Sequence, residues 1–230
     1  PLDGTAREYM SVPVASSVPV PAHFSDIEAA TLCCAAITAW NALAEMPVTA
    51  KDGGTVVTLG TGGVSLFALQ LAKARGARVI STSSSDEKLR RLKDLGADET
   101  INYREVPEWG KAVLGLTDGL GADLVVEVGG ADTIAQSMRA TRADGTMSLI
   151  GNVGGSIAEI NLPLVFMFRK RMIGISTGSV ADFADMMADL DGREDFHPAL
   201  DDHVYEFDGL SDALQALPKG QHFGKIAVRV

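Results

Sequence analysis

Short runs of β-branched and apolar residues alternate with longer amphipathic stretches between Gly54 and Gly178. This alternation is typical of repeated βαβ units, in which each helix carries the chain back to begin the next parallel strand. The spacing therefore predicts an α/β fold, with a doubly wound, six-stranded parallel sheet. The expected strands are residues 55–59, 78–82, 99–102, 123–128, 146–150 and 172–176.

The sequence changes character on both sides of this region. Ser25 and Glu28 have the spacing of a capping box, which predicts a helix that starts there and continues through residues 29–43. Residues 1–24 hold four prolines and two extended runs, at 8–12 and 17–20, which we interpret as the edge of a β-rich unit. The tail is expected to form a strand, a helix and a strand at 203–207, 211–217 and 225–230.

Charge and composition limit the partners. The chain has 30 acidic and 20 basic residues, a formal net charge of -10, which disfavours binding to nucleic acids and anionic membranes. Its longest apolar run, residues 162–168, is far shorter than the roughly 18 residues needed to span a bilayer, so we expect no transmembrane segment. Cys33 and Cys34 are adjacent and rarely compatible with a disulfide, so a reducing, cytoplasmic location is expected.

A glycine-rich loop follows the first expected strand. Gly60, Thr61, Gly62, Gly63 and Val64 lie between that strand and an apolar helical stretch. In a βαβ unit this is where backbone N–H groups at a helix N-terminus hold a pyrophosphate. The loop therefore predicts a dinucleotide site, whereas the alternative is a simple turn.

The end of the second strand bears on which dinucleotide is bound. An NAD site would carry a carboxylate there for the ribose 2′-hydroxyl, but the sequence reads Ser83, Ser84 and Ser85. Serine hydroxyls, with Lys88 or Arg90 nearby, suit a 2′-phosphate and favour NADP, with NAD possible. The alternative is that Ser85 only caps a helix while the basic residues pair with neighbouring acids.

Several ordered motifs resemble the medium-chain dehydrogenase/reductase superfamily, especially its quinone-oxidoreductase-like and zinc-type alcohol dehydrogenase-like members. The motifs are residues 34–40, 59–65, 83–98 with the ending Leu95-Gly96-Ala97-Asp98, 127–130 and 145–151. The resemblance implies a remnant of a GroES-like catalytic domain at 1–24, a Rossmann NAD(P)-binding domain at 25–195, and a segment returning to the catalytic domain at 196–230. It also implies a cofactor-domain fragment of a larger protein.

The resemblance also implies roles for individual residues. Thr38 matches the threonine beside the nicotinamide, and the loop from Gly60 to Val64 matches the pyrophosphate loop. Lys225 matches a basic residue near the cofactor phosphates, although it could equally be a solvated lysine on an edge strand. Four further residues match the loops that touch ribose and nicotinamide: Gly129, Gly130, Gly151 and Asn152. No catalytic acid or base is assigned.

A metal is a separate question. Cys34 matches one zinc ligand of the zinc alcohol dehydrogenases, whose Cys2His site keeps an open fourth position. The same cysteine in zinc-free relatives is a small buried residue. The four histidines of the chain show no ligand spacing, so the sequence itself assigns no metal site.

The resemblance implies an NADPH-dependent oxidoreductase that transfers hydride to or from a small quinone, enone, aldehyde or alcohol. Alternatives are a zinc-dependent alcohol dehydrogenase using Cys34 and a non-catalytic nucleotide-binding fragment. A short-chain dehydrogenase is excluded because no tyrosine is followed four residues later by lysine. A methyltransferase is disfavoured because it usually needs an acidic ribose partner where Ser83 stands.

The sixth strand bears on assembly. Related enzymes commonly dimerise by pairing this strand with its symmetry mate, so we expect a homodimer through residues 172–176. The alternative is that Arg169, Lys170 and Arg171 keep two copies apart by charge repulsion.

Overall fold

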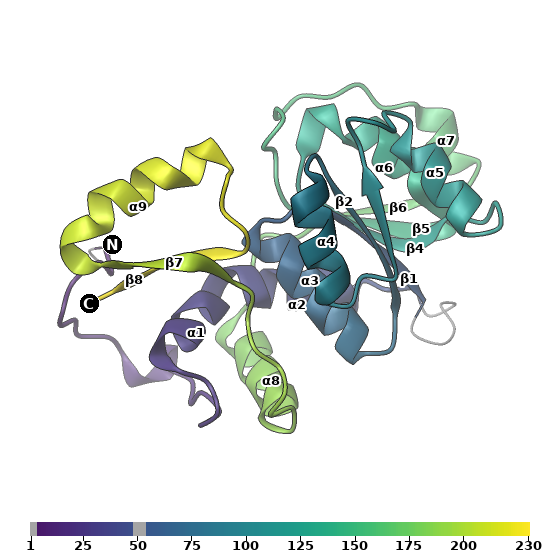
Figure 1. Cartoon of the computed structure of the whole chain (residues 1–230). Coiled ribbons are helices and arrows are strands. Elements are labelled where there is room, and N and C mark those ends of the chain that lie inside the picture. The colour runs from purple at the N-terminus through teal and green to yellow at the C-terminus, as the bar shows by residue number, and fades with distance from the viewer. Residues whose placement is uncertain (1–3, 48–53) are drawn as a thin grey trace.

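The computed structural model describes residues 4–47 and 54–230, and its largest element is a six-stranded parallel sheet (Figure 1). The strand order is β3-β2-β1-β4-β5-β6, so the order reverses between β1 and β4. This is the doubly wound Rossmann arrangement, and the predicted fold class is confirmed. The strands are β1 (Thr55–Leu59), β2 (Arg78–Ser83), β3 (Glu99–Asn102), β4 (Ala122–Glu127), β5 (Thr141–Leu149) and β6 (Arg171–Gly174).

Five of these strands lie within two residues of their predicted bounds, but β5 begins at Thr141, five residues before the predicted start at Thr146. The early part pairs Ala122 with Thr141, and the register then shifts before Leu124 pairs with Thr146. Asp144 inside this stretch has a φ of 60°, a turn-like conformation that breaks the strand pattern in the sequence.

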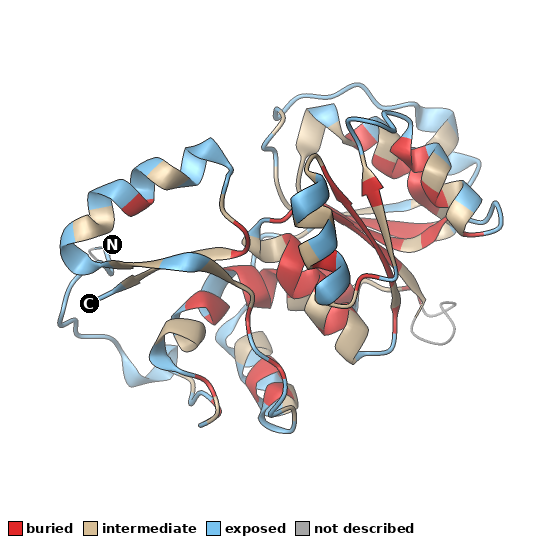
Figure 2. Ribbon diagram, in the orientation of Figure 1, coloured by how far each residue is buried: buried red, intermediate tan, exposed pale blue. Residues whose placement is uncertain are grey.

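Helices cover both faces of the sheet (Figure 1). The α-helices in the described residues are α1 (Asp26–Thr31), α2 (Ile37–Ala44), α3 (Gly63–Ala74), α4 (Asp86–Asp94), α5 (Trp109–Leu116), α6 (Ile134–Ala140), α7 (Leu162–Phe166), α8 (Val180–Asp191) and α9 (Leu210–Ala216), of which α9 lies with the C-terminal strands. Successive side chains of β1 point to opposite faces of the sheet: Val56 packs in the hydrophobic cluster under α2 and α3, and Val57 packs in the cluster under α5 and α6. The central strands are therefore buried on both sides (Figure 2).

The predicted capping box forms: the Ser25 hydroxyl accepts from the Glu28 amide, and the Glu28 carboxylate accepts from the Ser25 amide. A π-helical turn, Leu32–Ala36, joins α1 to α2. The resulting helix, Asp26–Ala44, has 19 residues and a mean hydropathy of 1.4, so it is long and apolar enough to cross a membrane. Half of it is buried in the molecule, which is typical of a core helix rather than a membrane span.

The chain ends form a separate region at the left of Figure 1. β7 (Leu200–Glu206) and β8 (Lys225–Arg229) pair in parallel in a two-stranded sheet, with α9 between them. The strands predicted at residues 8–12 and 17–20 are wrong, because residues 4–24 form no strand. Pro13 and Pro19 have no N–H to donate to a strand ladder. The predicted domain boundaries stay a prediction.

β6 lies at the edge of the large sheet. The basic residues before it are occupied within the chain: Lys170 donates to the carbonyls of Met138 and Thr141, and Arg169 pairs with Asp144. Arg171 pairs with Glu45. Three apolar side chains nearby are exposed, those of Leu162, Phe166 and Met167. Both the dimer and the alternative of charge repulsion stay predictions.

Candidate functional site

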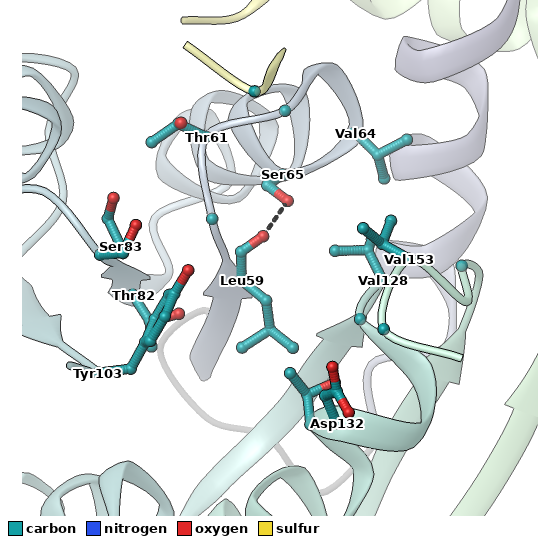
Figure 3. A pocket seen from close by; sticks show the side chains of 18 of the residues that line it. Leu59, Thr61, Val64, Ser65, Thr82, Ser83, Tyr103, Val128, Asp132 and Val153 are labelled. Atoms are coloured by element: carbon teal, nitrogen blue, oxygen red, sulfur yellow. Dashed lines mark hydrogen bonds between the residues drawn. The ribbon is translucent and has the colours of Figure 1, made fainter. Parts of the chain in front are cut away.

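A cleft of about 930 Å³ opens at the carboxyl ends of β1, β2 and β4, where the strand order reverses (Figure 3). Open α/β sheets bind their ligands at this position, because the loops after two diverging strands leave a crevice. The cleft is lined by the glycine loop after β1, by residues that follow β2, β3, β4 and β5, and by part of the C-terminal segment.

The glycine loop leads from β1 directly into α3. Gly60 has a φ of 74°, and its amide donates to the carbonyl of Thr82 on the neighbouring strand. Gly62 occupies the N-cap of α3 and brings no side chain that could accept from the first-turn amides. These amides can therefore hold an anion, which the helix dipole also favours.

Ser65 fastens the start of α3 to the sheet. Its hydroxyl is buried and donates to the carbonyl of Leu59 at 2.6 Å, the dashed line in Figure 3. In the dinucleotide fingerprint a third glycine serves close packing of helix and strand. Here a side-chain hydrogen bond connects the two elements directly.

Serine side chains follow β2. Ser83 is buried, Ser84 is partly exposed, and both line the cleft together with Lys88. Ser85 caps α4 by accepting from the Lys88 amide. Among the cleft-lining residues that the structure describes, one carries a carboxylate, Asp132. It follows β4, so it does not stand at the end of β2.

Lys88 contacts the C-terminal part of the chain. Its ammonium donates to the carbonyls of Gly220 and His222, both at 2.8 Å. Burial lowers its pKa, an effect that Asp201 opposes. An ammonium has three N–H donors, so these two bonds leave one for a ligand in the cleft.

Glu127 organises the loop after β4. Its side chain is 1% exposed, and Oε1 accepts from the amides of Gly129 and Gly130 at 2.7 and 2.9 Å. The hydroxyl of Thr133 donates to the same oxygen at 2.5 Å, and that of Ser137 donates to Oε2. The four bonds fix the Gly129–Gly130 turn at the edge of the cleft.

Ten predicted cofactor-binding residues line this cleft together. They are Gly60, Thr61, Gly62, Gly63, Val64, Ser83, Ser84, Lys88, Gly129 and Gly151. Gly130 and Asn152 do not belong to the lining, but they lie close together: a Cβ on Gly130 would come within 2.8 Å of the Asn152 Cα. Their roles as cofactor ligands stay predictions.

The two remaining predicted residues, Thr38 and Lys225, do not line the cleft. Thr38 is buried, and its hydroxyl donates to the carbonyl of Cys34 at 2.7 Å. Lys225 lies over the start of α3, where a Cβ on Gly63 would come within 2.5 Å of the Lys225 Cδ. Lys225 is therefore close to the first-turn amides of α3.

A zinc site is not assembled by the residues that the structure describes. In residues 4–47 and 54–230, no three His, Cys, Asp or Glu side chains lie close enough together to hold a metal ion. Cys34 has a free, exposed thiol.

Sequence reasoning missed several lining residues: Tyr103, Pro107, Trp109, Thr133, Gln136, Val153, Leu217, Pro218, Gly220 and His222. Tyr103 directly follows β3, so its place at a strand end was a usable signal. His222 gave none, because a contact over more than a hundred residues of sequence brings it to the cleft.

Comparisons with known proteins agree with this geometry. Residues 63–192 match the family model described as zinc-binding dehydrogenase. A zinc-type alcohol dehydrogenase-like protein of Schizosaccharomyces pombe is 42% identical over 99% of this chain and 67% of its own length. The chain thus spans about two thirds of that relative.

Solved structures show the same likeness. An NAD-dependent alcohol dehydrogenase superposes with a TM-score of 0.87 at 33% identity, covering 99% of this chain and 65% of that protein. A mycobacterial protein solved in complex with NADPH gives a TM-score of 0.81 at 26% identity, covering 95% and 69%. The chain belongs to the zinc-binding dehydrogenase family of the medium-chain dehydrogenase/reductase superfamily, and it corresponds to the cofactor-binding part of these proteins.

Proposed function

We propose that the cleft binds NADPH in preference to NADH, as part of an oxidoreductase that transfers hydride to or from a small quinone, enone, aldehyde or alcohol. The observation that carries the proposal is the end of β2, where Ser83, Ser84 and Lys88 stand in place of a carboxylate. Family membership supports the oxidoreductase activity. Of the two structures compared, one is named NAD-dependent and the other was solved with NADPH, so the nucleotide preference rests on the residues after β2.

The preference for NADPH follows from charge and hydrogen bonding. A 2′-phosphate needs donors and positive charge, which the Ser84 hydroxyl and the third N–H of Lys88 provide. A carboxylate at the same strand end would instead accept from the ribose hydroxyls of NADH and repel a phosphate. Each charge-assisted hydrogen bond is worth about 1.5–3 kcal/mol, so one such bond would give a preference of about tenfold or more.

The remaining parts of the cleft suit the rest of the dinucleotide. The first-turn amides of α3 would hold the pyrophosphate, with Lys225 beside them. Glu127 keeps the turn after β4 in place, and the apolar side chains of Val128, Ile150 and Val153 belong to the cleft lining beside it. When bound, the nicotinamide supplies the hydride chemistry, while these residues orient it.

Zinc-dependent alcohol dehydrogenase chemistry is the second candidate, favoured by the family description and by Cys34. The described residues do not complete a zinc site, so no step of the proposed reaction depends on zinc. A nucleotide-binding protein without turnover is the third candidate. Turnover of NADPH with quinones, enones and aldehydes by the full-length protein would separate the first candidate from the third.

The test is the affinity of the chain for both nucleotides, followed by nucleotide fluorescence or calorimetry. We expect NADPH to bind at least about tenfold more tightly than NADH. Ser84→Asp should reverse this order, because its carboxylate would repel the 2′-phosphate and accept from the ribose hydroxyls. Ser84 is preferable to Ser83 for this change, because a carboxylate at the buried Ser83 position would also impair folding.

Ser11→Asp is the matched control, since Ser11 is exposed in the N-terminal segment and outside the cleft lining. It adds the same charge and should leave both affinities unchanged. Equal binding of NADPH and NADH by the unmodified chain, or tighter binding of NADH, would refute the proposed preference.

A further inference from the structure

The C-terminal segment 217–225 forms one wall of the cleft. Leu217, Pro218, Gly220 and His222 belong to the lining. The segment is attached to the Rossmann sheet at two points: Lys88 binds the carbonyls of Gly220 and His222, and the Gly224 amide donates to the carbonyl of Thr61 at 3.0 Å. This wall is therefore connected both to the glycine loop and to the end of β2.

The backbone on either side of His222 is held in place. The amide of Phe223 donates to the Asp201 carboxylate at 3.0 Å. The Phe223 ring is buried, and the Arg91 guanidinium lies 4.0 Å from its centroid. His222 is thus presented at the cleft by a fixed stretch of chain next to Lys88.

The imidazole of His222 has an unmet hydrogen-bonding group. Its Nδ1 is buried and has no hydrogen-bond partner among the described residues. Buried polar atoms are normally paired, and an unpaired one costs free energy comparable to that of a lost hydrogen bond. The ring lines the cleft, so a rotation about its Cβ–Cγ bond would bring this nitrogen within reach of a ligand there.

The charges around the ring point to an anionic ligand. Burial and the positive charges of Lys88 on α4 and Lys225 on β8 lower the pKa of His222, while Asp201 on β7 raises it. Burial and these two positive charges therefore favour the neutral ring in the free chain. A phosphate in the cleft would counter both lysines and favour the protonated, two-donor imidazolium.

We propose that His222 contacts the 2′-phosphate of NADPH beside Lys88, so that the C-terminal segment contributes directly to the choice of cofactor. The inference rests on the proposed function, because it assigns a further ligand within the same site. The 2′-phosphate is favoured over the pyrophosphate because His222 adjoins Lys88, whereas Lys225 adjoins the first turn of α3.

The test uses 2′,5′-ADP and 5′-AMP, two nucleotides that differ only in the 2′-phosphate. His222→Gln keeps an N–H donor but cannot be protonated. His222→Leu has no N–H donor and cannot be protonated either. We expect 2′,5′-ADP to bind about tenfold more weakly to the leucine variant and less than that to the glutamine variant. Binding of 5′-AMP should change less than about twofold for both.

The matched control is His203→Gln, since His203 is exposed on β7 and lies outside the cleft lining. Calorimetry in two buffers of different ionisation enthalpy adds a readout that a structural role would not move. The unmodified chain should take up protons when it binds 2′,5′-ADP, and His222→Gln should take up fewer. Thermal unfolding of each variant identifies any that fails to fold.

The outcomes separate the two proposals. If the unmodified chain does not distinguish 2′,5′-ADP from 5′-AMP, the proposed NADPH preference is wrong. If it does, but the folded His222 variants bind both nucleotides as the unmodified chain does, only the assignment of His222 is wrong. Equal weakening of both nucleotides would also overturn it, because His222 would then act on a group common to the two.

Discussion

Replacement of Glu127 is the sharpest test of how the site is built. This carboxylate is buried at the end of β4 and accepts from two backbone amides and two hydroxyls. Glu127→Ala removes all four acceptors and leaves a cavity. Glu127→Gln keeps an acceptor oxygen at one position, and its amide group can donate to the Ser137 hydroxyl, which can rotate to accept.

The size of the effect follows from which donors can find other partners. The Thr133 hydroxyl already lies 3.3 Å from the Gly130 carbonyl, so it has a second acceptor. The amides of Gly129 and Gly130 are fixed by the turn, and each buried donor left unpaired costs about 1–3 kcal/mol. We therefore expect Glu127→Ala to lower the free energy of unfolding by about 2–5 kcal/mol, and Glu127→Gln by about 1–2 kcal/mol.

Denaturant unfolding of the chain gives these differences directly, and NADPH titration shows whether the turn after β4 matters for binding. Glu159→Ala is the control, because Glu159 is exposed and surface substitutions usually change stability by less than about 0.5 kcal/mol. A loss below about 1 kcal/mol for Glu127→Ala would refute the reasoning, because the two amides would then have to be satisfied without the carboxylate.

Three further outcomes follow from the structure. Gly151→Ala should destabilise the chain by a few kcal/mol and weaken NADPH binding. The new Cβ would come within 2.4 Å of the Val128 carbonyl oxygen, a backbone atom that cannot rotate away. Denaturant midpoints and NADPH titration measure the two effects. Burial raises the pKa of Asp98, but hydrogen bonds from Lys73 and a backbone amide outweigh it and lower the pKa overall. A depressed folded pKa adds stability above the unfolded pKa and loses it as pH falls through the folded pKa, so acid unfolding below about pH 4 should be less steep in Asp98→Asn. Phe166→Asp should convert the expected dimer to monomer in light scattering, whereas a monomeric unmodified chain would refute pairing through β6.

Local patterns predicted the sheet and the glycine loop well, because they depend on residues close in sequence. The run from Thr55 to Val64 contains its own strand, turn and helix start, and the structure places them as expected. Residues 8–12 look equally extended in sequence but form no strand. A strand also needs a partner, and the described residues offer none there.

The sequence did not reveal the parts of the site that depend on contacts between distant residues or on the donors that surround a buried side chain. Glu127 is an acid directly after the apolar run Leu124–Val126, a signal for a buried carboxylate that only the four surrounding donors explain. The wall at His222 is brought to the cleft by Lys88, a residue more than a hundred positions away. Neither arrangement follows from periodicity or from a motif.

Lys88 also explains why cofactor choice and the position of the C-terminal segment are connected. Two of its three donors hold the carbonyls of Gly220 and His222, and in the proposed complex the third would donate to the 2′-phosphate. A phosphate that accepts from this third donor helps to fix the ammonium, and with it the two carbonyls, in one position. A ligand that stabilises one arrangement of the segment must bind that arrangement more tightly, because the two equilibria are linked. NADPH would therefore hold segment 217–225 against the cleft, whereas NADH, without the 2′-phosphate, would leave this contact to the lysine alone.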